Sequence, residues 1–202
     1  MKKILQKTDT VLRKKAKEVP LVDIKKVKIK KILKEMAEAL RSQNDGVAIA
    51  APQIGYTLRI FLVAGKIFEK SFVENKTKNS EEKLLNQNNV ITESETKKTD
   101  EKIKPARPVG GDLVFINPKI SKLSKEKEWV PEGCLSVRPL YGKTFRSKKA
   151  TVTAHDEHGK KFTRGASGLL AQIFQHETDH LDGILFIDHA IEIREETLPI
   201  KK

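Results

Sequence analysis

Hydrophobic residues recur at helical spacing in two segments of the chain. The first, "DIKKVKIKKILKEMAEALRSQNDG", predicts a helix from about Asp23 to Ser42 with Asp23 as its N-cap. The buried face of this helix carries Ile29, Ile32, Leu33, Met36 and Leu40. The second segment, "SGLLAQIFQHETDHLDG", predicts a helix with Ser167 as its N-cap and Gly183 as its stop signal.

Short apolar or alternating runs between these helices predict strands. "LRIFLVAG" (58–65) and "DLVFINP" (112–118) are apolar runs bounded by turn residues. "KKATVTAHD" (148–156) alternates and leads through "EHG" into "KKFTRG", which predicts a hairpin. Strands and helices do not alternate regularly, so the pattern predicts an α+β fold of antiparallel strands around the second helix, with an N-terminal helix.

Residues 74–108, "ENKTKNSEEKLLNQNNVITESETKKTDEKIKPARP", break this pattern. The segment has no aromatic residue, few apolar residues and many Lys, Glu, Asn and Thr residues. Such a composition buries too little surface to offset the entropy of ordering the chain. We therefore predict one domain over 1–202 with a partly or wholly disordered insertion at about 74–108. A lid or a partner-binding loop is the functional alternative.

Composition indicates a cytoplasmic protein. The chain of 202 residues has one cysteine, Cys134, so it can form no internal disulfide, and a lone thiol suits a reducing compartment. No apolar run reaches the length of a membrane span, and the first residues lack the apolar core of a signal peptide. We expect no membrane partner.

Positive charge is concentrated at the N-terminal end of the chain. The net charge is +13, and residues 1–34 carry thirteen Lys or Arg residues against three acidic ones. Such a region could steer a protein towards RNA. It contains no interleaved aromatic residues and no nucleic-acid motif, so we expect a solvated face and no specific nucleic-acid partner.

The segment "QHETDH" carries the strongest chemical signal. His176 and His180 stand four residues apart, which on a helix places both imidazoles on one face. Two such imidazoles can hold one metal ion, with Glu177 beside it as a base. Two unrelated histidines on a helix are the alternative.

The sequence offers several candidates for a third ligand. In the longer pattern H-E-x-x-H-x-x-G-x-x-H the last position is Phe186, which has no donor atom, and His189 is out of register. Glu192, Glu195 and Glu196 lie in a short polar tail. Upstream, Cys134 in "WVPEGCLSVRP" is a soft ligand, and Gly133 beside it permits a close backbone approach. A small buried cysteine without a ligand role is the alternative for Cys134.

Three motifs, "GVAIAAPQIG", "EGCLS" and "QHETDHLDG", together resemble those of the peptide deformylase family, in order and spacing. The segments "TDTVLRKKAKEV", "LRIFLV", "FINPKI" and "GILFIDH" also resemble family segments, so the resemblance covers nearly the whole chain. It implies a hydrolase that removes the formyl group from N-formylmethionine on new polypeptides. It also implies one divalent metal ion, Fe(II) in cells, with Zn, Ni or Co as substitutes.

The resemblance assigns roles to particular residues. Cys134, His176 and His180 would hold the metal, and Glu177 would take the proton from the attacking water. The Gln53 amide and the backbone N–H of Leu135 would stabilise the oxyanion. Asp179 would either orient a ligand or be an exposed helix residue.

The resemblance also places the substrate as an added strand near the first motif, with the methionine side chain in an apolar pocket. Matching positions are Gly46, Val47, Ala48, Val130, Gly133, Leu169 and Ile173. Two positions depart from the family pattern. Ala48 replaces a usual glycine (beside it, Ile49 replaces a leucine), and Gln172 stands where an apolar residue is expected.

The predicted partners are N-formylmethionyl nascent peptides, with a transient ribosome contact and a monomeric enzyme. Two other functions fit part of the pattern. An H-E-x-x-H metallopeptidase would need a downstream ligand, and a degenerate deformylase kept as a binding protein would need no metal.

Overall fold

The computed structural model describes residues 1–68 and 111–196. Within these residues it contains two α-helices, α1 (Val27–Arg41) and α3 (Gly168–Leu181). The strands are β1 (Ala48–Ala50), β2 (Ile60–Val63), β3 (Leu113–Leu123), β4 (Lys127–Gly133), β5 (Leu140–Ser147), β6 (Lys149–His155), β7 (Lys161–Ser167) and β8 (Ile191–Glu195). Short 3-10 turns are η1 (Thr10–Arg13), η2 (Leu21–Asp23), η3 (Ala51–Ile54), η4 (Gly65–Phe68) and η5 (Phe186–Asp188).

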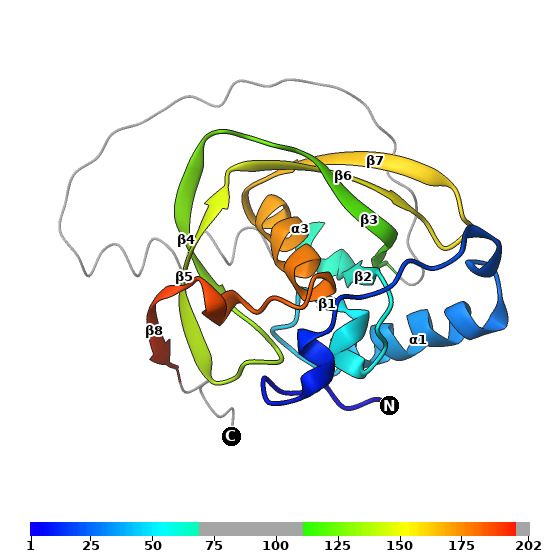
Figure 1. Cartoon of the computed structure of the whole chain (residues 1–202), viewed down its shortest axis with the longest axis horizontal. Helices are drawn as coiled ribbons and strands as arrows, with labels where there is room; N and C mark the ends of the chain where they lie inside the picture. The colour runs from blue at the N-terminus through cyan, green and yellow to red at the C-terminus, as the bar shows by residue number, and fades with distance from the viewer. Residues whose placement is uncertain (69–110, 197–202) are drawn as a thin grey trace.

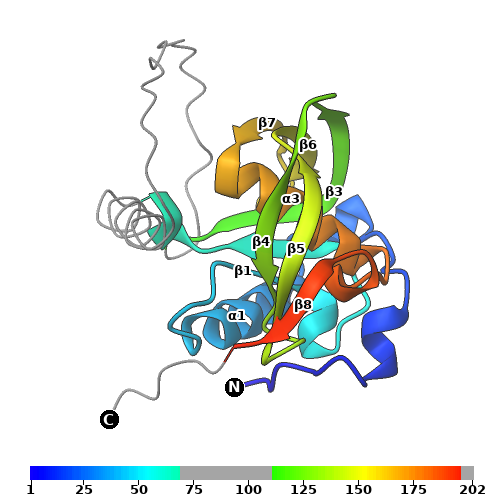
Figure 2. The same ribbon diagram turned by 90° about the vertical axis from the view of Figure 1, so that its left-hand side faces the viewer.

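The strands form two antiparallel sheets around α3. One sheet has the order β1-β2-β3-β6-β7 and the other the order β4-β5-β8. Figure 1 shows α3 at the centre with β3, β6 and β7 above it and β4, β5 and β8 on its left, and Figure 2 shows β4, β5 and β8 facing the viewer. The predicted α+β class, antiparallel strands and N-terminal helix are confirmed.

Strand β2 separates the two larger of the three clusters of buried hydrophobic residues. All four of its residues are buried, because both faces of the sheet are covered. Ile60 and Leu62 pack with the buried face of α1, whereas Phe61 and Val63 pack on the α3 side. The alternation of side chains along a strand thus places α1 and α3 on opposite faces. Phe61 stacks on Phe115 of β3 with a centroid distance of 4.5 Å.

Helix α3 is capped by backbone hydrogen bonds at its C-terminal end. Ser167 occupies the N-cap position, but its side chain makes no capping hydrogen bond. At the other end Gly183 has φ +79°, and the N–H groups of Gly183 and Ile184 donate to the carbonyls of His180 and Asp179. This is the Schellman arrangement, so the predicted stop at Gly183 is confirmed. A Cβ at Gly183 would lie 2.7 Å from the carbonyl oxygen of Arg13.

The predicted start of the N-terminal helix is wrong. Asp23 belongs to η2, and α1 begins at Val27 with Lys26 in the N-cap position. The Asp23 carboxylate pairs with Lys26 at 2.5 Å and does not cap the helix. The predicted hairpin is confirmed as β6 and β7, which pair from Lys149 with Ser167 to His155 with Lys161.

Strands β1, β4, β5 and β8 lie outside the sequence predictions. Pro131 and Gly133 argue against a strand in a central position, but β4 is an edge strand, where proline is tolerated. Strand β8 is exposed along its whole length. No helix in the part of the chain that the structure describes is both long and apolar enough to cross a membrane.

The predicted insertion at 74–108 lies outside the described residues, and the single-domain organisation stays a prediction. The residues on either side of 69–110 are adjacent in space. Val63 pairs with Leu113, and the N–H of Gly65 donates to Asp112 Oδ1 at 3.2 Å. A Cβ at Gly65 would overlap the carbonyl of Gly111. The segment therefore connects two neighbouring antiparallel strands.

Replacing residues 76–104 with a short Gly/Ser linker should leave soluble yield and the thermal unfolding midpoint nearly unchanged. The described residues that flank the segment, Gly65 and Gly111, already lie together, and the entropy of loop closure changes slowly with length. A deletion of 66–110 is the control, because it also removes Ile67 from the core and should lower the midpoint. Loss of soluble protein with the smaller deletion alone would show that the segment contributes to the fold.

Candidate metal centre

Three potential ligand atoms meet between α3 and the end of β4. The thiol of Cys134 and the imidazoles of His176 and His180 offer atoms that all lie within 4.8 Å of one another. Cys134 Sγ lies 3.1 Å from His180 Nε2. The rings of His176 and His180 meet edge to face, with centroids 4.8 Å apart. The structure therefore brings together the thiol and the two imidazoles that the sequence singled out.

Glu177 lies beside these atoms and is buried. It lines a cavity that Cys134 and His176 also line, and its Oε2 has no hydrogen-bond partner among the described residues. Burial raises the pKa of Glu177 to about 7. A carboxyl group near neutrality can both accept and release a proton at physiological pH.

Glu132 is the most important residue of the site that was not predicted from the sequence. Its Oε1 lies 2.6 Å from His176 Nδ1, and Arg146 donates to both of its carboxylate oxygens at 2.7 and 3.0 Å. Thr144 Oγ1 donates to Oε2 at 2.5 Å. Burial opposes ionisation of Glu132, but His176 and Arg146 outweigh it and hold its pKa well below the usual range. A carboxylate on Nδ1 leaves Nε2 of His176 free for a metal.

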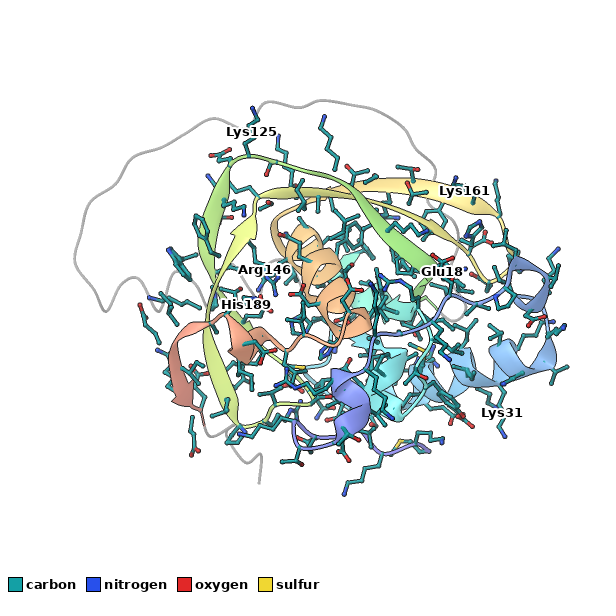
Figure 3. The ribbon with its side chains drawn as sticks, viewed as in Figure 1. Glu18, Lys31, Lys125, Arg146, Lys161 and His189 are labelled. Atoms are coloured by element: carbon teal, nitrogen blue, oxygen red, sulfur yellow. The ribbon has the colours of Figure 1, made fainter. Side chains whose placement is uncertain are left out.

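Asp179 belongs to the same network. Arg146 Nη1 donates to Asp179 Oδ2 at 2.6 Å, so Arg146 links Glu132 on β4 to α3. Figure 3 shows Arg146 between β5 and α3. Asp179 is therefore connected to His176 through Arg146 and Glu132 rather than by a direct hydrogen bond. The motif "EGCLS" contains Glu132, but its partner Arg146 lies on β5, a strand that periodicity did not predict.

Gln53 is buried against the site, although a lone glutamine in this context would ordinarily be exposed. Its Oε1 accepts from the N–H of Ala50 at 2.8 Å. Its Nε2 donates to Ser136 Oγ at 3.0 Å and lies 3.5 Å from Cys134 Sγ. The N–H of Ser136 also points at this sulfur, at 3.4 Å. Gln53 thus connects the backbone of β1 to the segment that carries Cys134.

The candidate ligands lie beside a cavity of about 570 Å³. Six of the seven predicted substrate residues line it: Gly46, Val47, Ala48, Gly133, Leu169 and Ile173. Val130 lies on β4 outside this lining, so the cavity gives no support to it. Gln53, Leu135 and Gln172 also line the cavity.

The structure shows why alanine fits at position 48 and why glycine is needed at position 133. Ala48 pairs with Val63 and does not adopt a positive φ, so alanine causes no backbone strain there. A Cβ at Gly133 would overlap the ring of Tyr141. Glycine is therefore needed at position 133 because the Tyr141 ring packs on it, whereas the sequence suggested a close backbone approach to a ligand.

The downstream candidates for a third ligand do not join the group of Cys134, His176 and His180, although Glu192 and Glu196 line the same cavity. The ring of Phe186 packs near His176, with centroids 6.5 Å apart. His189 Nε2 lies 3.9 Å from Asp179, and Glu192 pairs with Lys143 at 2.6 Å. Among residues 1–68 and 111–196, the set of Cys134 with two histidines is the one that fits a metal ion.

The donor set fits a divalent transition metal. One thiol and two imidazoles are ligands that zinc and iron accept, and three protein ligands leave a position open. Burial lowers the pKa of His180 well below its ordinary value, which keeps this imidazole neutral, the form that binds a metal. The chemistry of the donors thus agrees with a metal-binding role.

A thiol, two imidazoles and a buried carboxyl beside a cavity, on an α+β fold, are typical of metal-dependent hydrolases. The family described as "Polypeptide deformylase" matches residues 1–196 of the chain. The chain therefore belongs to the polypeptide deformylase family.

Individual relatives agree with this assignment. The chain is 35% identical over 193 residues to peptide deformylase 2 of Clostridium acetobutylicum, a match that covers 95% of this chain and 97% of that protein. It is 37% identical over 179 residues to a peptide deformylase of Borreliella burgdorferi, covering 89% and 81%. The crystal structure of a peptide deformylase from Legionella pneumophila is similar with a TM-score of 0.69, 29% identity and coverage of 95% and 87%.

Replacing Glu132 with glutamine should weaken metal binding and activity by about ten- to a hundredfold, because the charge that orients His176 is lost. Competition with a chelator and formate release measure the two effects. Asp179→Asn is the matched control, because it removes the same charge at the far end of the Arg146 network. Equal effects of the two substitutions would show that the direct contact between Glu132 and His176 does not determine metal binding or activity.

Proposed function

We propose that Cys134, His176 and His180 hold the metal with which this peptide deformylase removes the formyl group from N-formylmethionine of new polypeptides. The observation that carries the assignment of residues is the approach of their ligand atoms to within 4.8 Å, next to Glu177. Water adds to the formyl carbon, the C–N bond breaks, and formate and a free amino terminus are released.

In the proposed mechanism the protein moves protons and stabilises charge. When bound, a divalent metal supplies a Lewis acid and lowers the pKa of water. Glu177 accepts a proton from the attacking water and returns it to the departing amine nitrogen. The Gln53 amide, which lines the cavity, and the backbone N–H of Leu135 donate to the oxyanion that forms on the formyl carbon. Each such donor contributes about 3 kcal/mol to the transition state.

The nascent chain binds as an added strand in this proposal. Strands β1 and β4 are both edge strands, and both contribute to the cavity lining. An edge strand has unpaired backbone groups that can bind an extended peptide. Val47, Leu169 and Ile173 supply the apolar wall for the methionine side chain.

The proposed native metal is Fe(II), with Zn, Ni or Co as substitutes. One thiolate and two imidazoles suit several of these ions, and a ferrous site with a thiolate ligand is prone to oxidation. We place the enzyme in the cytoplasm in transient contact with the ribosome, because its substrate is the new polypeptide. We also propose that it is a monomer.

Formate release from a formyl-Met-peptide, measured on protein purified without air, tests this function. We expect one metal ion per chain, turnover that a chelator abolishes, and decay in air that a nickel-loaded sample resists. A peptide with an internal amide and no formyl group is the control and should stay uncut. Protein without metal and without formate release would instead be a binding protein.

A further inference from the structure

Helix α3 presents one polar side chain to the cavity that the mechanism does not use. The cavity-lining residues of this helix follow helical spacing and are Leu169, Gln172, Ile173, His176 and Glu177. His176 and Glu177 belong to the proposed chemistry, and Leu169 and Ile173 are apolar. Gln172 is therefore a polar group in the part of the wall that would contact a methionine side chain.

The amide of Gln172 spans from α3 to β4. Its Nε2 donates to the carbonyl of Pro131 at 2.9 Å, and both residues line the cavity. A primary amide has a second N–H and a carbonyl oxygen. Neither has a hydrogen-bond partner among the described residues, so a bound side chain can use them.

Gln172 lies where the far end of the methionine side chain would reach. The formyl carbon must lie beside the candidate ligands and Glu177. Gln172 precedes His176 by four residues, and one helical turn rises about 5.4 Å. A methionine side chain spans a comparable distance, so in the proposed binding mode its sulfur would lie close to the Gln172 amide.

We propose that Gln172 extends the substrate class of this enzyme to peptides that begin with N-formylmethionine sulfoxide. Oxidation turns the apolar thioether into a polar group with a hydrogen-bond acceptor. A pocket of purely apolar residues rejects such a group, because its oxygen would be buried without a partner. The free N–H of Gln172 supplies that partner. The proposal rests on the proposed function.

The reaction on the oxidised substrate is the same hydrolysis. Water adds to the formyl carbon, the C–N bond breaks, and formate leaves, while the sulfur keeps its oxygen. No oxidant or reductant is consumed. The enzyme would thus free the amino terminus of a polypeptide whose first residue has been oxidised.

Gln172→Met tests the proposal, because methionine keeps the length of the side chain and removes its hydrogen bonds. The quantity to measure is the ratio of kcat/KM for a formyl-Met-sulfoxide peptide to kcat/KM for the formyl-Met peptide. We expect this ratio to fall about tenfold in the variant, the loss typical of one hydrogen bond. The wild type should also prefer one sulfoxide epimer, because a fixed donor meets only one of them well, and the variant should lose this preference.

A formyl-norleucine peptide is the matched substrate, since it has the shape of methionine and no sulfur. Its kcat/KM relative to formyl-Met should be the same in both proteins. If Gln172 only ties α3 to β4, all three substrates will lose activity together and the sulfoxide ratio will not change, which overturns the proposal. Gln172→Glu, which offers no donor when ionised, is a second variant and should lower the ratio as well. Failure of the wild type to hydrolyse formyl-Met would overturn the proposed function instead.

Discussion

Cys134→Ala should abolish metal binding and deformylation together. The substitution removes the one thiol among the three candidate ligands, and His176 and His180 alone leave an incomplete donor set. Loss of a ligand should exceed the ten- to hundredfold effect of disturbing a group that only orients one, so we expect a loss of more than about 100-fold. Metal content after gel filtration and formate release measure the two losses.

Two further measurements make the interpretation of Cys134→Ala specific. Cys134→Asp keeps an anionic ligand atom on a side chain of similar reach and should retain more metal than the alanine variant. Circular dichroism of both variants shows whether the fold is intact. An alanine variant that still holds one metal tightly and still releases formate would show that Cys134 is not a ligand.

Glu177→Gln should lower turnover by about two to four orders of magnitude while metal content and substrate binding persist. Glutamine has the size of glutamate but cannot accept the proton from water. The Oε2 atom of Glu177 has no hydrogen-bond partner among the described residues, so the amide breaks no contact of that oxygen. Single-turnover formate release reports the chemical step, and metal analysis reports the site.

Glu38→Gln on α1 is the matched control for this charge change, because Glu38 is in no ion pair between described residues and lies outside the cavity lining. It should leave turnover unchanged. Near-normal turnover in Glu177→Gln would remove this carboxylate from the mechanism and leave proton transfer to another group.

Gln53 and Asp179 illustrate where prediction from sequence was incomplete. Sequence alone could not decide whether either residue is exposed, because burial depends on what packs over it. The structure buries Gln53 between the backbone of Ala50 and the side chain of Ser136. Ser136 is distant in the chain, and contacts of this kind leave no periodic trace in the sequence.

Features that depend on neighbours along the chain could be predicted from the sequence alone. Helical spacing placed His176, Glu177 and His180 together, and alternation with a turn signal predicted the β6–β7 hairpin. The order and spacing of the three motifs indicated the family. The helix and the hairpin rest on contacts within a few residues, which local spacing encodes.

Features that depend on strand pairing required the tertiary structure. Pairing set Cys134 against α3, placed Arg146 of β5 between Glu132 and Asp179, and formed the cavity between two edge strands. The start of α1, at Val27 rather than at Asp23, was likewise seen only in the structure. The contacts between strands follow from the register of segments that are far apart in sequence, and register is selected by the packing of the whole core rather than by any one segment.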